Sequence, residues 1–243
     1  MKVDLEICIN CDGPQSVYDA VSAAYYGGAA RVELCAAMHL DGLTPGKEHI
    51  SEARKAFKDR PGLMVMIRPR ADNFCYSTSE LTLMKQQIEM AAAIRADGVV
   101  FGVLQKTDFR LSLPALDILV NLSRKNNLTT TFHRAFDATP DAFEALQILI
   151  DFGVDRVLTS GTNWQGRQPA TKGKQKLSRL IEASNRQIEI VIGGGINRSA
   201  IRALTKALPI DQGNVSFHAY SASLDNDSTT METVSTLDEV ART

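Results

Sequence analysis

Two cysteines three residues apart, Cys8 and Cys11 in the segment LEICINC, raise the first chemical question of this sequence. A Cys-x-x-Cys pair can form a redox disulfide or hold a metal ion. A redox pair usually has its first cysteine at a helix N-terminus, whereas the apolar and β-branched residues around Cys8 predict a strand. A zinc site would need a second close pair, and Cys35 and Cys75 are far apart. Two inert buried thiols are the structural interpretation, and Cu(I) bound by soft thiolates is the functional one.

Ionisable side chains also lie within otherwise apolar segments. Glu6 and Glu33 belong to two predicted strands, and Arg68 and His133 end two others. Burying an unpaired charge is costly, so we expect Glu6 and Glu33 to face Arg68 and His133 in one polar layer. Histidine can act as a general acid or base near neutral pH, and Asp137 could orient His133 or the arginine beside it. These five residues are the catalytic candidates, and a purely structural ion-pair network is the alternative.

A glycine-rich turn, GGGIN at 193–197, follows a predicted strand and precedes a predicted helix. Such a turn exposes backbone N–H groups at the positive end of a helix, which favours an anion. We therefore take Gly194 and Gly195 as anion-binding candidates, with Arg70 for a second charge and Ser160 at another strand end. A tight turn that only requires positive φ is the alternative. The segment is not a G-x-G-x-x-G dinucleotide motif, and no organic cofactor is implied.

The elements that would position these residues alternate along the chain. Apolar, β-branched runs predict eight strands, at 3–9, 30–35, 63–68, 97–102, 128–134, 155–160, 188–193 and 214–219. Helical segments are predicted between them, at about 14–27, 46–58, 78–95, 114–126, 140–152, 174–186 and 198–207. This alternation predicts the α/β class, and at 243 residues a single (β/α)8 TIM barrel is the most economical fold. An open doubly wound sheet is second. In a barrel, the functional site lies at the C-terminal ends of the strands.

Composition limits the partners and the location. The formal net charge is -1, so we expect no nucleic acid partner, and no apolar run approaches the roughly 18–20 residues of a membrane span. The N-terminal segment lacks the pattern of a signal peptide, which predicts a cytoplasmic protein with reduced cysteines. We expect the barrel domain over residues 1–223. Residues 224–243 form a polar tail, either loosely held or a short terminal helix.

Several short segments, in this order and spacing, resemble the CutC family. They are LEIC (5–8), RVELCAA (31–37), GLTP (42–45), IRPR (67–70), FCYS (74–77), TFHRAFD (131–137), RVLTSG (156–161) and GGGI (193–196). The resemblance implies a (β/α)8 barrel, a link to copper homeostasis and Cu(I) binding by two cysteines, which correspond to Cys8 and Cys35. Cys11 matches no cysteine of the family.

The resemblance has three departures. The family pattern RPRGGDF is RPRADNF here, at 68–74, and the stretch TNWQGRQPATKGKQ (162–175) is longer and more basic than expected. Little likeness is visible beyond Ser223, which leaves a final helix open.

Three functions are therefore open. The first is a copper homeostasis protein that binds Cu(I) without turnover. The second is a barrel enzyme of lyase or isomerase type, acting on a small anionic metabolite such as a phosphorylated one, with incidental copper binding. The third is a scaffold that has lost its chemistry. A homodimer or higher homo-oligomer is expected because homo-oligomers are common among soluble proteins.

Overall fold

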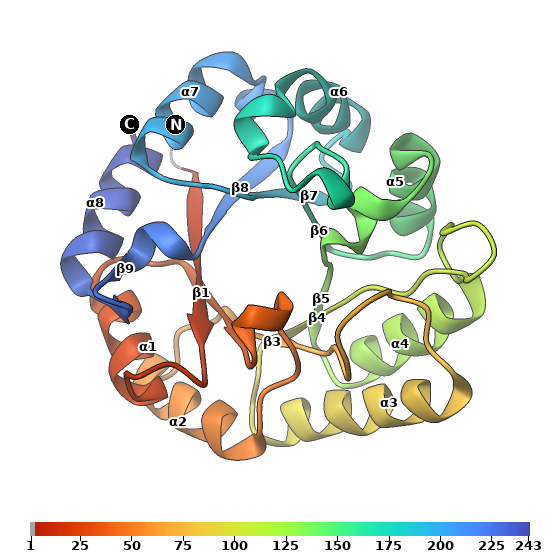
Figure 1. Ribbon diagram of the computed structural model, residues 1–243, viewed down its shortest axis with the longest axis horizontal. Helices are drawn as coiled ribbons and strands as arrows, with labels where there is room; N and C mark the ends of the chain where they lie inside the picture. The colour runs from red at the N-terminus through yellow and green to blue at the C-terminus, as the bar shows by residue number, and fades with distance from the viewer. Residues whose placement is uncertain (1–2) are drawn as a thin grey trace.

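Eight parallel strands close into a barrel in the computed structural model, which describes residues 3–243 (Figure 1). The strands are β1 (Asp4–Asn10), β2 (Arg31–Cys35), β3 (Leu63–Met66), β4 (Gly98–Phe101), β5 (Thr129–Phe132), β6 (Arg156–Thr159), β7 (Glu189–Gly193) and β8 (Asn214–Ala219). Each strand pairs with the next in the chain, and β8 pairs with β1 with Glu6 opposite His218. The predicted TIM barrel is confirmed, and each predicted strand overlaps an observed one.

Helices surround the barrel on the outside, as Figure 1 shows. They are α1 (Val17–Tyr26), α2 (Lys47–Phe57), α3 (Thr78–Ala93), α4 (Leu113–Lys125), α5 (Ala142–Asp151), α6 (Lys174–Ser184), α7 (Arg198–Ala207) and α8 (Met231–Ala241). The seven predicted helices are all present, although some begin later than predicted. Helix α5 begins at Ala142 and not at 140, because the Asp141 carboxylate accepts hydrogen bonds from the backbone N–H groups of Phe143 and Glu144, at 2.8 and 3.1 Å.

The tail after Ser223 forms ordered structure. A two-stranded hairpin, β9 (Leu224–Asp225) with β10 (Ser228–Thr229), leads into α8, so the short terminal helix is what residues 231–241 form. Figure 1 shows α8 between α7 and α1, and the buried side chains of Val234 and Leu237 pack into that space. The Val3 N–H donates to the Ala241 carbonyl at 3.2 Å, which ties the two ends of the chain together.

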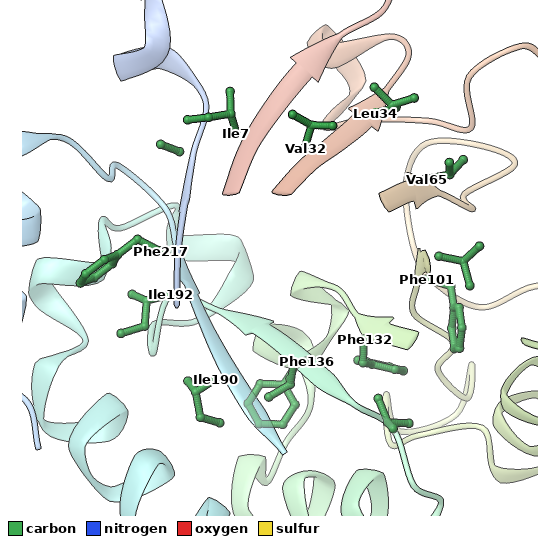
Figure 2. Close-up of a cluster of buried hydrophobic side chains, with 14 of the residues drawn as sticks. Ile7, Val32, Leu34, Val65, Phe101, Phe132, Phe136, Ile190, Ile192 and Phe217 are labelled. Atoms are coloured by element: carbon green, nitrogen blue, oxygen red, sulfur yellow. The ribbon is translucent and has the colours of Figure 1, made fainter. Parts of the chain in front are cut away.

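Strand alternation divides the core into two layers. One set of side chains faces the helices, and it includes Ile7, Phe132 and Phe217, labelled in Figure 2. The alternate positions form a second, smaller cluster inside the barrel. Its members are Cys8, Cys35, Met64, Met66 and Val100, with Met38 and Tyr220 packed against it. The inward face of the barrel is therefore rich in sulfur near the ends of β1, β2 and β3.

Candidate functional site

The two cysteines on adjacent strands share one site inside the barrel. Cys8 lies on β1 and Cys35 ends β2, and both are 2% exposed. The sulfur atoms of Cys8 and Cys35 and a carboxylate oxygen of Glu33 all lie within 4.8 Å of one another. The resemblance implied this pair. In the β1–β2 register Cys8 is opposite Glu33 and Asn10 is opposite Cys35, which brings the two inward-facing thiols close together.

A third sulfur lies beside the two thiols. Met38 belongs to the single-turn helix η1 (Met38–Leu40) that follows β2, and its Sδ lies 3.9 Å from Cys8 Sγ. The turn is fixed at its start, where the Asp12 carboxylate accepts a hydrogen bond of 2.6 Å from the N–H of Ala37. Ala37 adopts a left-handed conformation there, with φ of 48°, which turns the chain back over the strand ends. The site therefore offers three soft sulfur donors.

The opening Cys-x-x-Cys pair does not act as a pair. Cys11 packs in the layer between strands and helices, where its thiol lies 4.0 Å from the Ile9 carbonyl oxygen. Burial raises the pKa of the Cys11 thiol far above its ordinary value. Cys75 lies outside the strands, in the segment between β3 and α3. Neither thiol belongs to the cluster that contains Cys8.

Glu6 lies in an ion-pair network below the thiols. Its carboxylate contacts Arg156 Nη2 at 2.5 Å, His218 Nδ1 at 2.8 Å and Arg31 Nε at 3.4 Å. Burial alone would raise the pKa of Glu6, but these cations outweigh it and hold the pKa well below its usual range. The predicted pairing of Glu6 with Arg68 and His133 is wrong, because arginines at the starts of β2 and β6 reach it first.

Glu33 and His218 lie between this network and the thiols. His218 Nε2 is 3.4 Å from Glu33 Oε2, and its Nδ1 faces Glu6. Burial would lower the pKa of His218, but the carboxylates on both sides and Cys8 hold it well above its ordinary value. Burial raises the pKa of Glu33 to about 8. The imidazole of His218 is thus positively charged beside Cys8.

The two thiols ionise unequally. The neighbouring Cys35 lowers the pKa of Cys8 to about 6, against the effect of burial, and His218 lowers it further. The neighbouring Cys8 and burial raise the pKa of Cys35 well above its ordinary value, and the Cys35 thiol donates to Glu33 Oε2 at 3.6 Å. At neutral pH the pair therefore carries one thiolate, on Cys8, which is the form of sulfur that binds metals and electrophiles.

Within residues 3–243, neither Arg68 nor His133 contacts a carboxylate. Arg68 Nη1 donates to the carbonyl oxygens of Leu40, Asp41 and Gly42 at 2.8, 3.1 and 2.9 Å. His133 Nδ1 accepts a hydrogen bond of 3.1 Å from the N–H of Ala135. Burial and the charge of Arg68 lower the pKa of His133 to about 3. His133 is therefore neutral near pH 7, with its proton on Nε2, and is not the near-neutral acid or base that the sequence suggested.

Three other candidates, Asp137, Ser160 and Arg70, bind neighbouring side chains and do not line the cavity at the C-terminal ends of the strands. Asp137 is buried and accepts from Arg134 Nε at 2.9 Å and from Thr159 Oγ1 at 2.5 Å, so it orients the arginine and not His133. The Ser160 hydroxyl donates to the same carboxylate at 2.9 Å. Arg70 pairs with Glu80 at 2.5 Å and holds the loop after β3. Each of the three side chains is therefore bound to a neighbouring residue of the protein.

A cavity of about 390 Å³ opens at the C-terminal ends of the strands. Its lining residues are Cys8, Glu33, Cys35, Met38, Asp41, Met66, Arg68, Phe74, His133, Arg134, Leu158, Trp164, Gly193, Gly194, Gly195, Ile196, His218, Tyr220 and Ser221. The structure thus brings Glu33, Arg68, His133, both cysteines and both glycines of the predicted sites to one space. The barrel mouth is the candidate site.

Several contributors could not be found from the sequence. Met38 and Trp164 lie in turns after strands, and no periodic pattern indicates that these turns fold over the mouth. Arg156 could have been identified, because it is a charged residue in the predicted strand DRVLTS. It lies two residues before Leu158, so the two side chains face the same side of the strand. His218 lies within the predicted strand at 214–219, but no sequence pattern marks it as the partner of both glutamates.

Comparisons with known proteins agree with the resemblance seen in the sequence. The family model described as CutC family matches residues 3–219. A family protein CutC from Bacteroides fragilis is 41% identical over 207 residues, which cover 85% of this chain and 77% of the relative. A family protein CutC from Vibrio parahaemolyticus is 36% identical over 217 residues, which cover 89% and 82%.

Solved structures show the same barrel. A Streptococcus agalactiae protein, described as a copper homeostasis protein CutC, superposes with a TM-score of 0.77 at 26% identity, covering 89% of this chain and 98% of that one. The 3-keto-L-gulonate-6-phosphate decarboxylase of Vibrio cholerae superposes with a TM-score of 0.66 at 15% identity, covering 99% and 98%. The second likeness shows the fold alone.

Between residues 3 and 243, no helix has the length and apolar character needed to cross a membrane.

Proposed function

The chain belongs to the CutC family, and from this premise we propose that it is a copper homeostasis protein that binds Cu(I) through the thiolates of Cys8 and Cys35. One observation carries the proposal. Two buried thiols from adjacent strands lie within 4.8 Å of each other, with the Met38 sulfur 3.9 Å from Cys8 Sγ. Cysteine and methionine sulfur are the soft ligands that select Cu(I).

The surroundings of the thiols fit a soft cation. Met66 and Tyr220 add apolar and aromatic surface beside the sulfur atoms, and such surface limits the access of water to a bound ion. Cys8 is already a thiolate near neutral pH, whereas Cys35 must release a proton when it binds a metal. Met38 is the third donor. Its thioether is neutral, so it adds a ligand without adding charge.

The test is an anaerobic Cu(I) titration against a competing chelator. We expect one ion per chain, bound at picomolar affinity or tighter. Cys8→Ser and Cys35→Ser should each weaken binding by more than about 100-fold, since loss of outer contacts alone costs about 10- to 100-fold. Met38→Leu should weaken it by about 10-fold. Cys11→Ser is the matched control, because it removes a buried thiol outside the cavity.

The outcome separates a specific site from adventitious binding. Affinity that survives Cys8→Ser together with Cys35→Ser, or that falls equally in Cys11→Ser, would contradict the assignment. The proposal requires reduced thiols, so the cytoplasm remains our predicted location. A homodimer or higher homo-oligomer also remains a prediction.

A further inference from the structure

The cavity is much larger than a single copper ion requires. Its volume of about 390 Å³ lies within the range of about 300–1,000 Å³ that is usual for small-molecule sites. The thiols belong to β1 and β2, whereas His133 follows β5, which lies across the closed ring of eight strands from β1. The residues that follow β3 and β5 bring a different chemistry to this cavity.

Arg68, which follows β3, carries a buried positive charge without a carboxylate partner among the described residues. Arg68 is 2% exposed and lines the cavity. Its guanidinium donates to four backbone carbonyl groups, of Leu40, Asp41, Gly42 and Asp72, and within residues 3–243 no carboxylate forms an ion pair with it. Carbonyl groups carry no net charge, and an unpaired buried charge is costly.

The other arginines of the barrel interior show the contrast. Arg31 pairs with Glu189 at 2.6 Å, and Arg156 pairs with Glu6 at 2.5 Å. The fold therefore supplies acids for these two arginines and supplies none, among the described residues, for Arg68. A ligand that carries a negative charge would neutralise Arg68, as Glu189 and Glu6 neutralise the other two arginines.

His133 adds an unsatisfied donor next to Arg68. Because Nδ1 accepts the Ala135 N–H, the ring proton is on Nε2, on the other side of the ring. His133 is 4% exposed, and within residues 3–243 its Nε2 has no hydrogen-bond partner. Phe74 touches both groups, with its ring centre 5.3 Å from the Arg68 guanidinium carbon and 5.0 Å from the His133 ring centre. Two buried donors thus share one wall.

The glycine turn at the mouth offers further donors. Gly194 and Gly195 have φ of 100° and 68°, and a side chain at Gly194 would come within 3.2 Å of Ser160 Cβ. Within the described residues, no protein acceptor contacts the N–H groups of Gly194, Gly195 or Ile196. They precede α7, whose N-terminus favours negative charge.

We propose that this wall binds a small organic anion, whose carboxylate or phosphate oxygens accept from His133 Nε2 and neutralise Arg68. The anion occupies the cavity alongside the thiol site and does not depend on it. The glycine N–H groups then hold the part of the molecule nearest to the mouth. The inference concerns binding, and no reaction follows from it.

The test is isothermal titration calorimetry of the metal-free, reduced 243-residue chain with two anionic probes and one neutral analogue. Pyruvate represents a carboxylate, inorganic phosphate represents a phosphate, and pyruvamide is the neutral counterpart of pyruvate. We expect saturable binding of at least one anion and none of pyruvamide. Arg68→Met and His133→Phe should each weaken the affinity by at least about 10-fold, the loss usual for a charge-assisted hydrogen bond. His133→Gln keeps an N–H donor and should retain most of the affinity.

Two control variants separate this inference from the copper proposal. Arg70→Met removes the same charge two residues away, outside the cavity, and should leave the anion affinity within about twofold of wild type. Cys8→Ser should not weaken the anion affinity, even though it weakens Cu(I) binding by more than about 100-fold. Absence of binding by both anions up to about 10 mM, or an equal loss in Arg70→Met and Arg68→Met, would overturn the inference. His133→Phe and His133→Gln keep it testable if Arg68→Met fails to fold.

Discussion

At the scale of single residues, the site shows how neighbours decide what a side chain does. His133 and His218 both lie near the C-terminal ends of strands. His218 lies between Glu6 and Glu33, whereas His133 lies near Arg68. The first imidazole is therefore charged and the second neutral. The sequence identifies His133 as a candidate and places His218 only within a predicted strand, because it does not contain the distances that separate their roles.

The neutral state of His133 predicts a pH dependence of stability. The unfolded chain binds a proton at this histidine below its ordinary pKa of about 6.5, whereas the folded protein does so only near 3. Stability is therefore lost as the pH falls from 6.5 towards 3, by about 2 kcal/mol for this residue at pH 5. Urea unfolding of wild type and His133→Gln at pH 7 and pH 5 measures it.

The variant should lose about 2 kcal/mol less than wild type over that interval. His39→Gln, which removes an exposed histidine, should behave as wild type. Equal losses in wild type and His133→Gln would mean that His133 is protonated in the folded protein.

At the scale of the elements, the sequence predicts which strands and helices exist better than it predicts which side chains meet. The apolar runs place all eight strands, and alternation correctly puts Glu6 with Cys8 and Glu33 with Cys35 on inward faces. The partner of Glu6 is Arg156, 150 residues away. Such a pair depends on how far each strand is staggered in the closed barrel, and no local pattern records that stagger.

The Glu6 network predicts a large effect of removing its charge. Glu6 joins β1 to β2, β6 and β8 through Arg31, Arg156 and His218. Glu6→Gln leaves the buried Arg156 and the half-buried Arg31 short of a negative charge, so the free energy of unfolding should fall by about 3 kcal/mol. Urea unfolding at pH 7 tests this, with the exposed Glu48→Gln as the control.

A double substitution shows whether the effect comes from the pair. Glu6→Gln combined with Arg156→Met should cost less than the sum of the two single changes, because each removes the same interaction. Additive costs would show that Glu6 and Arg156 act independently, contrary to the network described above.

At the scale of the whole molecule, the last 20 residues complete the ring of helices. Gly27 at the end of α1 lies so close to Val234 that an added Cβ would come within 2.6 Å of the valine Cβ. Asp238 and Val240 are also buried on this helix. A polar composition concealed the helix in the sequence, since only one narrow face of α8 is apolar, and the hairpin before it separates α8 from the repeating strand–helix pattern.

If α8 is part of the ring of helices that supports the barrel, a substitution on its buried face should destabilise the entire fold. Leu237 is 2% exposed, whereas Met231 on the same helix is 56% exposed. Leu237→Ala should lower the free energy of unfolding by about 2–4 kcal/mol in a single cooperative transition, because it leaves a cavity between α8 and its neighbours. Met231→Ala should change it by less than about 0.5 kcal/mol.

Equal, small effects would show that the helix docks loosely and that the barrel is stable without it. A separate early transition in Leu237→Ala would instead show that α8 unfolds as its own unit, and Cu(I) binding should then persist after that first transition, since neither thiol touches the helix.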